Sequence, residues 1–229
     1  MTTPSRRRVG RPRAQERPDD GGLTPREEVL AAAAELFTHH GYTATSTRTI
    51  AERAGLRQAS LYHHFDGKEA ILAALLEGTV HPSLDVARRL VARSEASPEA
   101  RLWALCHSDA ALLCGGPHNL GALYLLPEVQ ADRFAVFHRV RSELKACYGT
   151  LLAATEPGSL LSAEDLELRT DLVFGLSESV ILIRRAGPDR VPEALATATA
   201  DAALRVTGVA QRSLARLRRE GQLLLAAGD

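Results

Sequence analysis

From Thr24 onward, the sequence is a series of helix-forming segments separated by short breaks that contain glycine or proline. Alanine, leucine, arginine and glutamate dominate these segments, and no run of β-branched residues alternates with polar ones. Breaks such as Gly115-Gly116-Pro117 and Gly187-Pro188 are typical of helix ends. The sequence therefore predicts an all-α fold.

The first helix has a strong start signal in Thr24-Pro25-Arg26-Glu27, because threonine suits the N-cap, proline the first helical position and glutamate the third. We expect this helix to end at Gly41. A fourth helix begins near Lys68, and Gly78 and Pro82 are expected to break or kink it. The other helices are expected over about 45–55, 58–65, 84–91, 98–114, 119–126, 128–155, 162–186, 191–207 and 209–226.

Composition limits the class of protein. In a chain of 229 residues, 45% hydrophobic content supplies a real core and excludes global disorder. The sequence contains no run of about 18 apolar residues, so we do not expect a membrane-spanning helix. No apolar run follows the N-terminal arginines, so we do not expect a cleaved secretion signal. Cys106, Cys114 and Cys147 show no Cys-x-x-Cys spacing, which indicates reduced thiols in a cytoplasmic protein.

The charge is balanced overall, with 28 basic and 28 acidic residues, but it is unevenly distributed. A segment with almost no apolar residues opens the chain, and its only acid before Asp19 is Glu16. We expect residues 1–22 to form a flexible basic arm, either a solvated tail or a segment that lies along phosphates or in a minor groove. Its arginines are Arg6, Arg7, Arg8, Arg11, Arg13 and Arg17.

The stretch from Thr45 to Phe65 predicts a helix-turn-helix. Two short helices cross steeply only where their contact residues are small; Ala51 allows that approach, and Gly55 supplies the positive φ that the turn needs. Leu61 and Phe65 are expected to point inward with other apolar residues. The outward side chains of the helix over 58–65 are then mostly polar, on a helix thin enough to enter a major groove.

Leu61-Tyr62-His63-His64-Phe65, the following Lys68-Glu69-Ala70, the first helix and the turn at Gly55 resemble the TetR family of bacterial transcriptional regulators. The resemblance covers roughly residues 24–76. It implies an all-helical homodimer with an N-terminal three-helix DNA-binding domain, over 23–76, and a C-terminal helical bundle for ligand binding and dimerisation, over 77–229. Two departures leave the operator sequence open: Ala59 stands where many members have glycine or proline, and two histidines replace an aromatic-histidine pair.

By the same resemblance, Thr47, Arg48, Gln58 and Tyr62 match positions that contact DNA, and His64 and Lys68 match positions that commonly hold phosphates. Arginine bonds the O6 and N7 of guanine, and Gln58 is suited to adenine; Arg57 suits a guanine or a phosphate equally well. Tyr62 is either a packed aromatic or part of the DNA face, and its polar neighbours favour the latter. The full expected DNA-binding set is Thr47, Arg48, Arg57, Gln58, Ser60, Tyr62, His63, His64 and Lys68.

The C-terminal part carries no catalytic motif, so no catalytic residue and no cofactor is expected. Cys106, His107, Asp109, Cys114 and His118 include residue types that bind zinc, but their spacing matches no standard site. We expect no metal site there; the simpler interpretation is that the cysteines fill the core. A metal-dependent enzyme built on Cys106, His107 and Cys114 is the minor alternative.

Aromatic residues are only 4% of the chain, so their gathering within about 35 residues is informative. The expected effector pocket is lined by Trp103, His107, Tyr124, Phe134 and Phe137, although the same rings are nearly as well explained as core. The absence of a dense charge cluster there favours an apolar or weakly polar ligand.

Dimerisation is expected through the helices at about 162–186 and 191–207, because small residues let helices approach closely. The first carries Leu166, Val173, Leu176, Val180 and Ile183 with Gly175, Ser177 and Ser179 between them, and the second carries Ala194, Ala198 and Ala202. The leading hypothesis is a repressor of double-stranded DNA, released from a palindromic operator by a small apolar ligand. A DNA-binding regulator without a ligand is the alternative.

Overall fold

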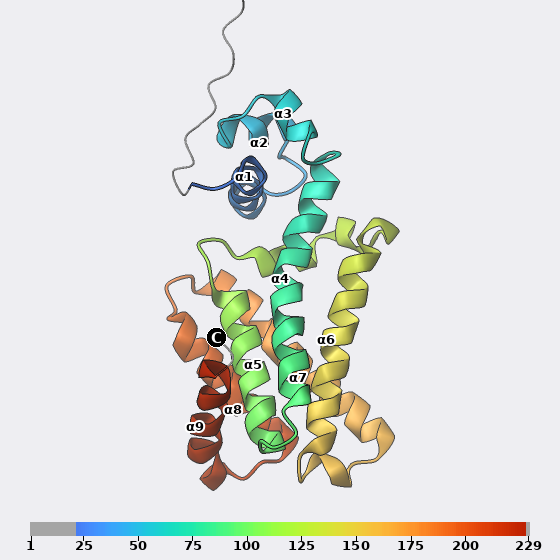
Figure 1. Cartoon of the computed structure of the whole chain (residues 1–229), viewed down its shortest axis with the longest axis vertical. Helices are drawn as coiled ribbons and strands as arrows, with labels where there is room; N and C mark the ends of the chain where they lie inside the picture. The colour runs from blue at the N-terminus through green and yellow to red at the C-terminus, as the bar shows by residue number, and fades with distance from the viewer. Residues whose placement is uncertain (1–21, 228–229) are drawn as a thin grey trace, which may run out of the picture.

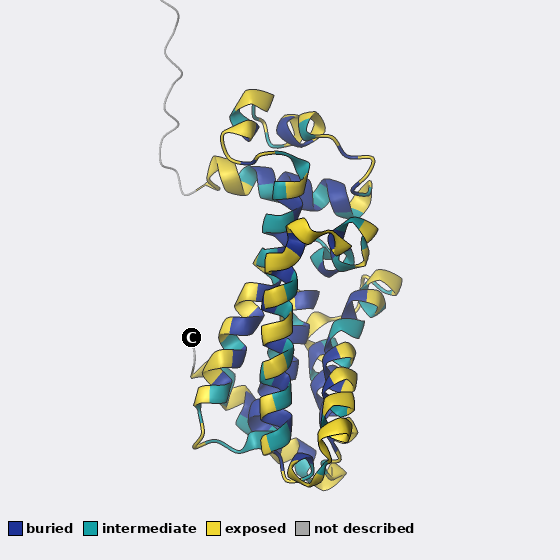
Figure 2. Cartoon of the chain, turned by 90° about the vertical axis from the view of Figure 1, so that its right-hand side faces the viewer, coloured by how far each residue is buried: buried dark blue, intermediate teal, exposed yellow. Residues whose placement is uncertain are grey.

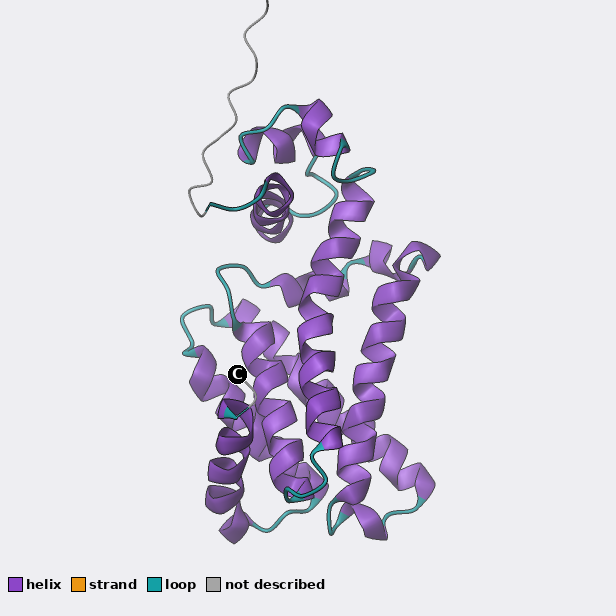
Figure 3. Cartoon of the chain, in the orientation of Figure 1, coloured by secondary structure: helices purple, strands orange, loops and turns teal. Residues whose placement is uncertain are grey.

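The computed structural model describes residues 22–227, which are helical with no strand among them (Figure 1, Figure 3). Three short helices form a unit at one end, and the long helix α4 joins this unit to a bundle made by α5–α9 (Figure 1). The expected all-α architecture is confirmed. The expected basic arm, residues 1–22, lies outside the described residues except for Gly22.

The N-terminal unit consists of α1 (Pro25–His39), α2 (Thr47–Arg53) and α3 (Gln58–Tyr62). The predicted capping box of α1 is present: the Glu27 amide donates to Thr24 Oγ1 at 3.3 Å, and the Thr24 amide donates to Glu27 Oε2 at 2.8 Å. The third helix is shorter than expected, because the amides of His63 and His64 already bond three residues back, to Ser60 and Leu61. Residues 63–65 therefore form a tight turn instead of continuing the helix.

Helix α4 (Lys68–Ala92) is continuous, so the break expected at Gly78 and Pro82 does not occur. Proline in a helix loses one hydrogen bond and presses its ring on the carbonyl four residues earlier, which here belongs to Gly78. The boundary expected between residues 76 and 77 falls inside α4, so a helix, and not a loop, connects the two units (Figure 1).

Helix α5 (Pro98–Cys114) is the centre of the bundle and contacts each of the other bundle helices as well as α4. It is buried nearly all round, as a helix enclosed by others must be. Around it lie α6 (Ala135–Ala154), α7 (Ala163–Ala186), α8 (Pro192–Thr207) and α9 (Leu214–Ala226). Their bounds agree with the expected helices except at the start of α6 and of α9.

The segment between α5 and α6 differs most from expectation. In place of α-helices over 119–126 and from 128, it has three short 3₁₀ helices, η1 (Leu120–Leu125), η2 (Pro127–Gln130) and η3 (Asp132–Phe134). This segment packs closely on α7: a Cβ on Gly121 would lie 2.6 Å from Ile181 Cγ1. Two further 3₁₀ turns, η4 (Gly158–Leu160) and η5 (Gln211–Ser213), precede α7 and α9.

One continuous core runs from the N-terminal unit along α4 into the bundle (Figure 2). α4 alone among the helices of residues 22–227 is long and apolar enough to cross a membrane by length and composition, and 44% of that apolar window is buried inside the protein. Its apolar side chains serve the core: Ile71, Leu72 and Leu76 have no exposed surface. The length and hydropathy of α4 therefore fit its role as the helix that joins the two units.

Candidate functional site

The turn between α2 and α3 is built by three local features. Ser46 caps α2, because its Oγ accepts a hydrogen bond from the Thr49 amide at 3.1 Å. Gly55 then takes a φ of +69°, a conformation that side chains disfavour, and the chain turns back. The Leu56 amide closes the turn on the Ala51 carbonyl at 2.9 Å.

The inner side of this pair of helices is apolar. Ile50, Ala51 and Leu61 are at most 1% exposed, and Phe65 is buried beside them. The unit is also tied together by polar contacts, since Arg53 of α2 pairs with Glu35 of α1 at 2.6 Å. The orientation of α3 is therefore set by core packing on one side and leaves its opposite side to solvent.

Three of the expected DNA-binding side chains meet at the outer surface. The Tyr62 hydroxyl lies 3.1 Å from Thr47 Oγ1, and Gln58 Nε2 lies 3.5 Å from the same atom. Tyr62 is 49% exposed although its neighbour Leu61 is fully buried. We call Thr47, Gln58 and Tyr62 the polar triad. It presents donors and acceptors from two helices on one surface, which a groove of duplex DNA can accommodate.

The other residues expected to contact DNA lie around the polar triad, and they differ in burial and in their hydrogen-bond partners. Arg57 is the N-cap residue of α3 and is exposed, as are His63 and His64 just beyond the helix. Ser60 is half-buried. Arg48 is exposed and pairs with Glu52 one turn along α2, at 2.9 Å. Arg48, Arg57, His63 and His64 are therefore the four exposed polar residues of this set around the polar triad.

Lys68, which is expected to hold a phosphate, is half-buried and already has partners inside the N-terminal unit. Its Nζ donates to the Tyr42 carbonyl at 2.9 Å and lies 4.2 Å from the centre of the Tyr42 ring. The ammonium thereby fixes the loop after α1 to the first turn of α4. In this arrangement Lys68 holds the N-terminal unit together.

Of the five aromatic and histidine side chains expected to line one pocket, four form two separate pairs, and Phe134 belongs to neither. Trp103 stacks on His107 at 4.8 Å within α5, and the Trp103 indole donates to Asp201 of α8 at 2.9 Å. The rings of Tyr124 and Phe137 form the second pair, with their centres 4.9 Å apart. Trp103, Phe134 and Phe137 are at most 2% exposed, so these rings fill the core.

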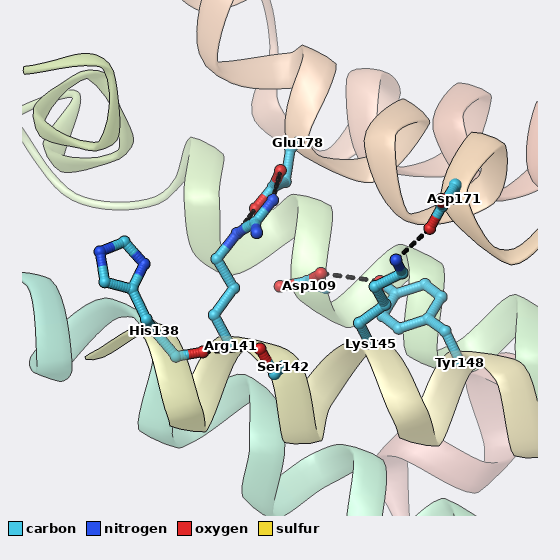
Figure 4. Close-up of polar contacts among 8 residues, drawn as sticks. All are labelled: Asp109, His138, Arg141, Ser142, Lys145, Tyr148, Asp171 and Glu178. Atoms are coloured by element: carbon cyan, nitrogen blue, oxygen red, sulfur yellow. Dashed lines mark hydrogen bonds and ion pairs between the residues drawn. The ribbon is translucent and has the colours of Figure 1, made fainter. Parts of the chain in front are cut away.

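The interior of the bundle holds a polar cluster that sequence reasoning missed (Figure 4). Asp109 of α5 accepts hydrogen bonds from Ser83 and Tyr148, both at 2.7 Å. Burial raises the pKa of the Asp109 carboxyl, although these two hydrogen bonds oppose the shift. Nearby, Arg141 of α6 forms a two-pronged pair with Glu178 of α7, at 2.6 and 2.5 Å. These residues lie 26 to 39 positions apart or on different helices, so no local pattern indicates the cluster.

Tyr124, Asp109 and Arg141 border a small interior cavity of about 10 Å³. It is lined by Thr79, Val80, Asp109, Leu113, Tyr124, Arg141, Leu144, Phe174 and Glu178. A space of that size holds about one water molecule at most. In this conformation the polar cluster occupies the place where α4, α5, α6 and α7 meet.

The outer faces of α7 and α8 carry apolar and small residues. Leu168, Leu172 and Leu182 of α7 are 54–59% exposed, and Gly175 is exposed between them. The interpretation of the α7 residues needs one correction: Val173 and Val180 have no exposed surface, because they face the protomer core. Leu166, Leu176 and Ile183 are half-buried. On α8, Ala194 and Ala198 are exposed and Ala202 is half-buried.

No group of three or more histidine, cysteine or carboxylate side chains within residues 22–227 is arranged to hold a metal ion. Cys106 is fully buried, and burial raises the pKa of its thiol, which makes it a poor ligand or nucleophile. His107 is 7% exposed and pairs with Glu193 at 3.0 Å.

Known proteins resemble the chain over both units. The model of the family described as "Bacterial regulatory proteins, tetR family" matches residues 29–75, the region of the polar triad. The crystal structure of AmtR from Mycobacterium smegmatis is 46% identical and superposes with a TM-score of 0.81, covering 92% of this chain and 98% of that one.

Two repressors named KstR2 are also similar. The HTH-type transcriptional repressor from Rhodococcus jostii is 34% identical over 147 residues, which are 62% of this chain and 71% of that protein. The one from Mycobacterium tuberculosis is 41% identical over 80 residues, which are 35% of this chain and 40% of that protein. The likeness therefore extends from the N-terminal unit well into the bundle.

Proposed function

The chain belongs to the TetR family of bacterial transcriptional regulators, and from that premise we propose that it is a homodimeric repressor whose two copies of α3 enter successive major grooves of a palindromic operator. It is a DNA-binding regulator and not an enzyme, as its relatives are. The proposal concerns which residues touch DNA, how the dimer forms and how binding is regulated.

The observation that carries the proposal is the polar triad. Thr47, Gln58 and Tyr62 come from both helices of the helix-turn-helix and meet at the surface, directly above the buried Leu61. Unsatisfied hydrogen-bonding capacity on a rigid, exposed helix is what recognition of base edges requires. A role in binding another protein would not explain why this surface exposes so little apolar area.

The roles of the surrounding residues follow from their chemistry. Gln58 is proposed to read a base, since its amide pairs with the N6 and N7 of adenine. Arg48 and Arg57 are proposed to contact a guanine or phosphates, and Ser60, His63 and His64 are placed for phosphate or base contacts at the edge of the groove. Lys68 is proposed to support binding through the loop that it fixes, with the Tyr42 carbonyl as its partner.

The dimer is proposed to form through α7 and α8. Leu168, Leu172 and Leu182 are each more than half exposed and lie along one helix with Gly175 between them, which concentrates exposed apolar surface on α7. Ala194 and Ala198 allow α8 to approach a partner helix closely. Two such helices from each protomer form a four-helix interface with two-fold symmetry, which a palindromic operator matches.

Release by a small ligand is proposed as the regulatory step, with α4 as the element that transmits it, because α4 belongs to both units. The five residues first expected to line the pocket are packed as core, and the adjacent cavity is about 10 Å³. This packing favours the second candidate function, a regulator that takes no ligand inside its bundle. A cytoplasmic location is proposed because the operator is there.

The test is a gel-shift assay with the purified dimer and the DNA that precedes its own gene. Tyr62→Ala and Gln58→Ala are each expected to abolish the shift at the protein concentration that just saturates it for the parent, while the variants stay dimeric in sedimentation. Leu125→Ala, an equally exposed apolar position in η1, is the control and is expected to bind normally. Unchanged affinity of both triad variants would show that another surface binds the DNA.

A further inference from the structure

A cleft of about 710 Å³ separates the N-terminal unit from the bundle. One wall is α1, with Leu30 and Ala31, and the opposite wall is formed by α4 and α5, with Gly78 and Leu112. The segment that follows α5 closes one end. In Figure 1, α1 lies above the end of α5, and α4 passes beside both. The cleft is therefore bounded by both units and lies apart from the bundle interior.

The walls of this cleft are apolar and made of small side chains. None of its lining residues is an aspartate, glutamate, lysine or arginine. Gly78 is exposed, and a side chain added there meets no atom within 4 Å, so the cleft is open at the middle of α4. Leu112 of α5 is 43% exposed, which is unusual for a leucine in the central helix of a bundle. A volume of this size suits a small organic molecule.

His118 closes the cleft and also borders a second cavity, of about 640 Å³, on the other side of the segment. The second cavity is lined by His39, His118, Arg184 and Arg185, and no acidic residue lines it. The rings of His39 and His118 lie 5.6 Å apart. The nearest carboxylate, Glu35, is already paired with Arg53. The second cavity, which shares Pro117 and His118 with the end of the apolar cleft, is thus lined by basic side chains without an acid among them.

Arg184 and Arg185 differ in the partners that they already have. The Arg184 guanidinium donates to the backbone carbonyls of Gly115, Gly116 and His118, at 3.0, 2.6 and 3.2 Å, and so fixes the segment. Arg185 is exposed and forms no ion pair with any residue of 22–227. Burial and the nearby His39 lower the pKa of His118, which an anion at this position would raise. Arg185 and His118 are therefore available for a negative charge.

We propose that this cleft binds an apolar molecule that carries a single carboxylate. The apolar part lies between α1 and α4 against Ala31, Gly78 and Leu112, and the carboxylate points past His118 toward Arg185. An apolar wall that ends at the His118 imidazole, with the unpaired Arg185 guanidinium beyond it, selects this combination over a neutral or a cationic compound.

This ligand site is an addition to the proposed function. Only the effect of the ligand on operator binding rests on that function, whereas binding of the ligand itself does not. A molecule in the cleft touches α1 of the DNA-binding unit and α4 and α5 of the bundle at once. Its affinity therefore depends on how the two units are placed, and operator affinity changes in return by the same factor. Binding itself is measured on the free dimer, so its failure is distinguishable from a failure to bind DNA.

The test is calorimetric titration of the full-length dimer with three compounds that share one apolar group: 4-phenylbutyrate, 4-phenylbutan-1-ol and 4-phenylbutylamine. We expect the acid to bind at least tenfold more tightly than the alcohol, and the amine more weakly than either. Arg185→Ala and His118→Ala are each expected to reduce the affinity for the acid toward that for the alcohol. Equal affinity for the three compounds, or no binding of the acid at millimolar concentration, would overturn the proposal.

Two variants of α4, which add the same side chain inside and outside the cleft, test where the ligand binds. Gly78→Phe fills the cleft and is expected to weaken binding of the acid at least tenfold. Ala92→Phe adds the same side chain to an exposed position at the end of α4, outside the cleft, and is expected to change nothing. Circular dichroism and the gel shift verify that both variants fold and bind DNA. Full binding by Gly78→Phe would place the ligand elsewhere and contradict the inference.

Discussion

The hydroxyl of Tyr62 lies 3.1 Å from Oγ1 of Thr47, which joins α3 to the first turn of α2 at the surface that we propose faces DNA. Tyr62→Phe keeps the ring, which is 49% exposed, and removes the hydroxyl that makes this contact and that we propose bonds to DNA. One hydrogen bond contributes about 0.5–1.5 kcal/mol, so the operator affinity is expected to fall roughly 2- to 10-fold. The measurement is fluorescence anisotropy with labelled operator, and the thermal midpoint is expected to stay unchanged. Equal affinity of the variant and the parent would remove Tyr62 from the DNA face.

The proposed dimer depends on the exposed leucines of α7. Leu172→Glu places a charge at the centre of the proposed interface, where it has no partner, and is expected to give a folded monomer. Leu223→Glu on α9, where the leucine is 71% exposed, is the control and is expected to remain a dimer. Analytical ultracentrifugation distinguishes the two states. A dimeric Leu172→Glu protein would mean that another face forms the interface.

Two glycines that look alike in the sequence are expected to respond in opposite ways to alanine. A Cβ on Gly221 of α9 would lie 2.4 Å from Trp103 Cε3 and 3.1 Å from the Ala100 carbonyl oxygen. We expect Gly221→Ala to lower the free energy of unfolding by about 1–3 kcal/mol, as overpacking does. Gly78→Ala meets open space in the middle of a helix and is expected to raise it by about 0.5–1 kcal/mol. Urea unfolding tests both, and a similar effect of the two substitutions would contradict the packing of α9 on Trp103.

The buried carboxyl of Asp109 makes stability depend on pH. Burial raises its pKa in the folded protein above the unfolded value of about 3.9, so the folded state binds the proton more tightly. The stability contribution is fully present below the unfolded pKa and is lost as pH rises through the folded pKa. Asp109→Asn removes this dependence, so its stability relative to the parent is expected to improve from pH 4 toward pH 7. Parallel pH profiles of the two proteins in urea unfolding would show that folding does not raise the pKa of the Asp109 carboxyl.

Local signals in the sequence predict the N-terminal unit well. Thr24 and Glu27 form the capping box, and Gly55 takes the positive φ of the turn, because each depends only on residues next to it in the chain. The segment over 119–134 was predicted less well. Its helical composition favours α-helix, but the contact of Gly121 with Ile181 of α7 is a tertiary constraint that no local pattern carries.

The candidate sites divide in the same way. The polar triad could be predicted, because Thr47, Gln58 and Tyr62 lie within one motif. The cleft could not, since Ala31, Gly78 and Leu112 come from three helices and are ordinary helix residues where they stand. The aromatic side chains gathered in sequence but not in space, because Trp103 and Phe137 lie on helices that present them to different parts of the core.

Selection of bound sequences from a random DNA pool by the full-length dimer tests the central claim most directly. The account predicts enrichment of one inverted repeat, with half-sites about one helical turn apart or a multiple of it. It also predicts that Gln58→Ala retains the symmetry of the site but accepts any base at the position that the glutamine reads, at a cost of about 1–3 kcal/mol in affinity. Enrichment of an asymmetric site, or an unchanged preference of the Gln58→Ala dimer at every position, would contradict the claim that α3 reads the operator.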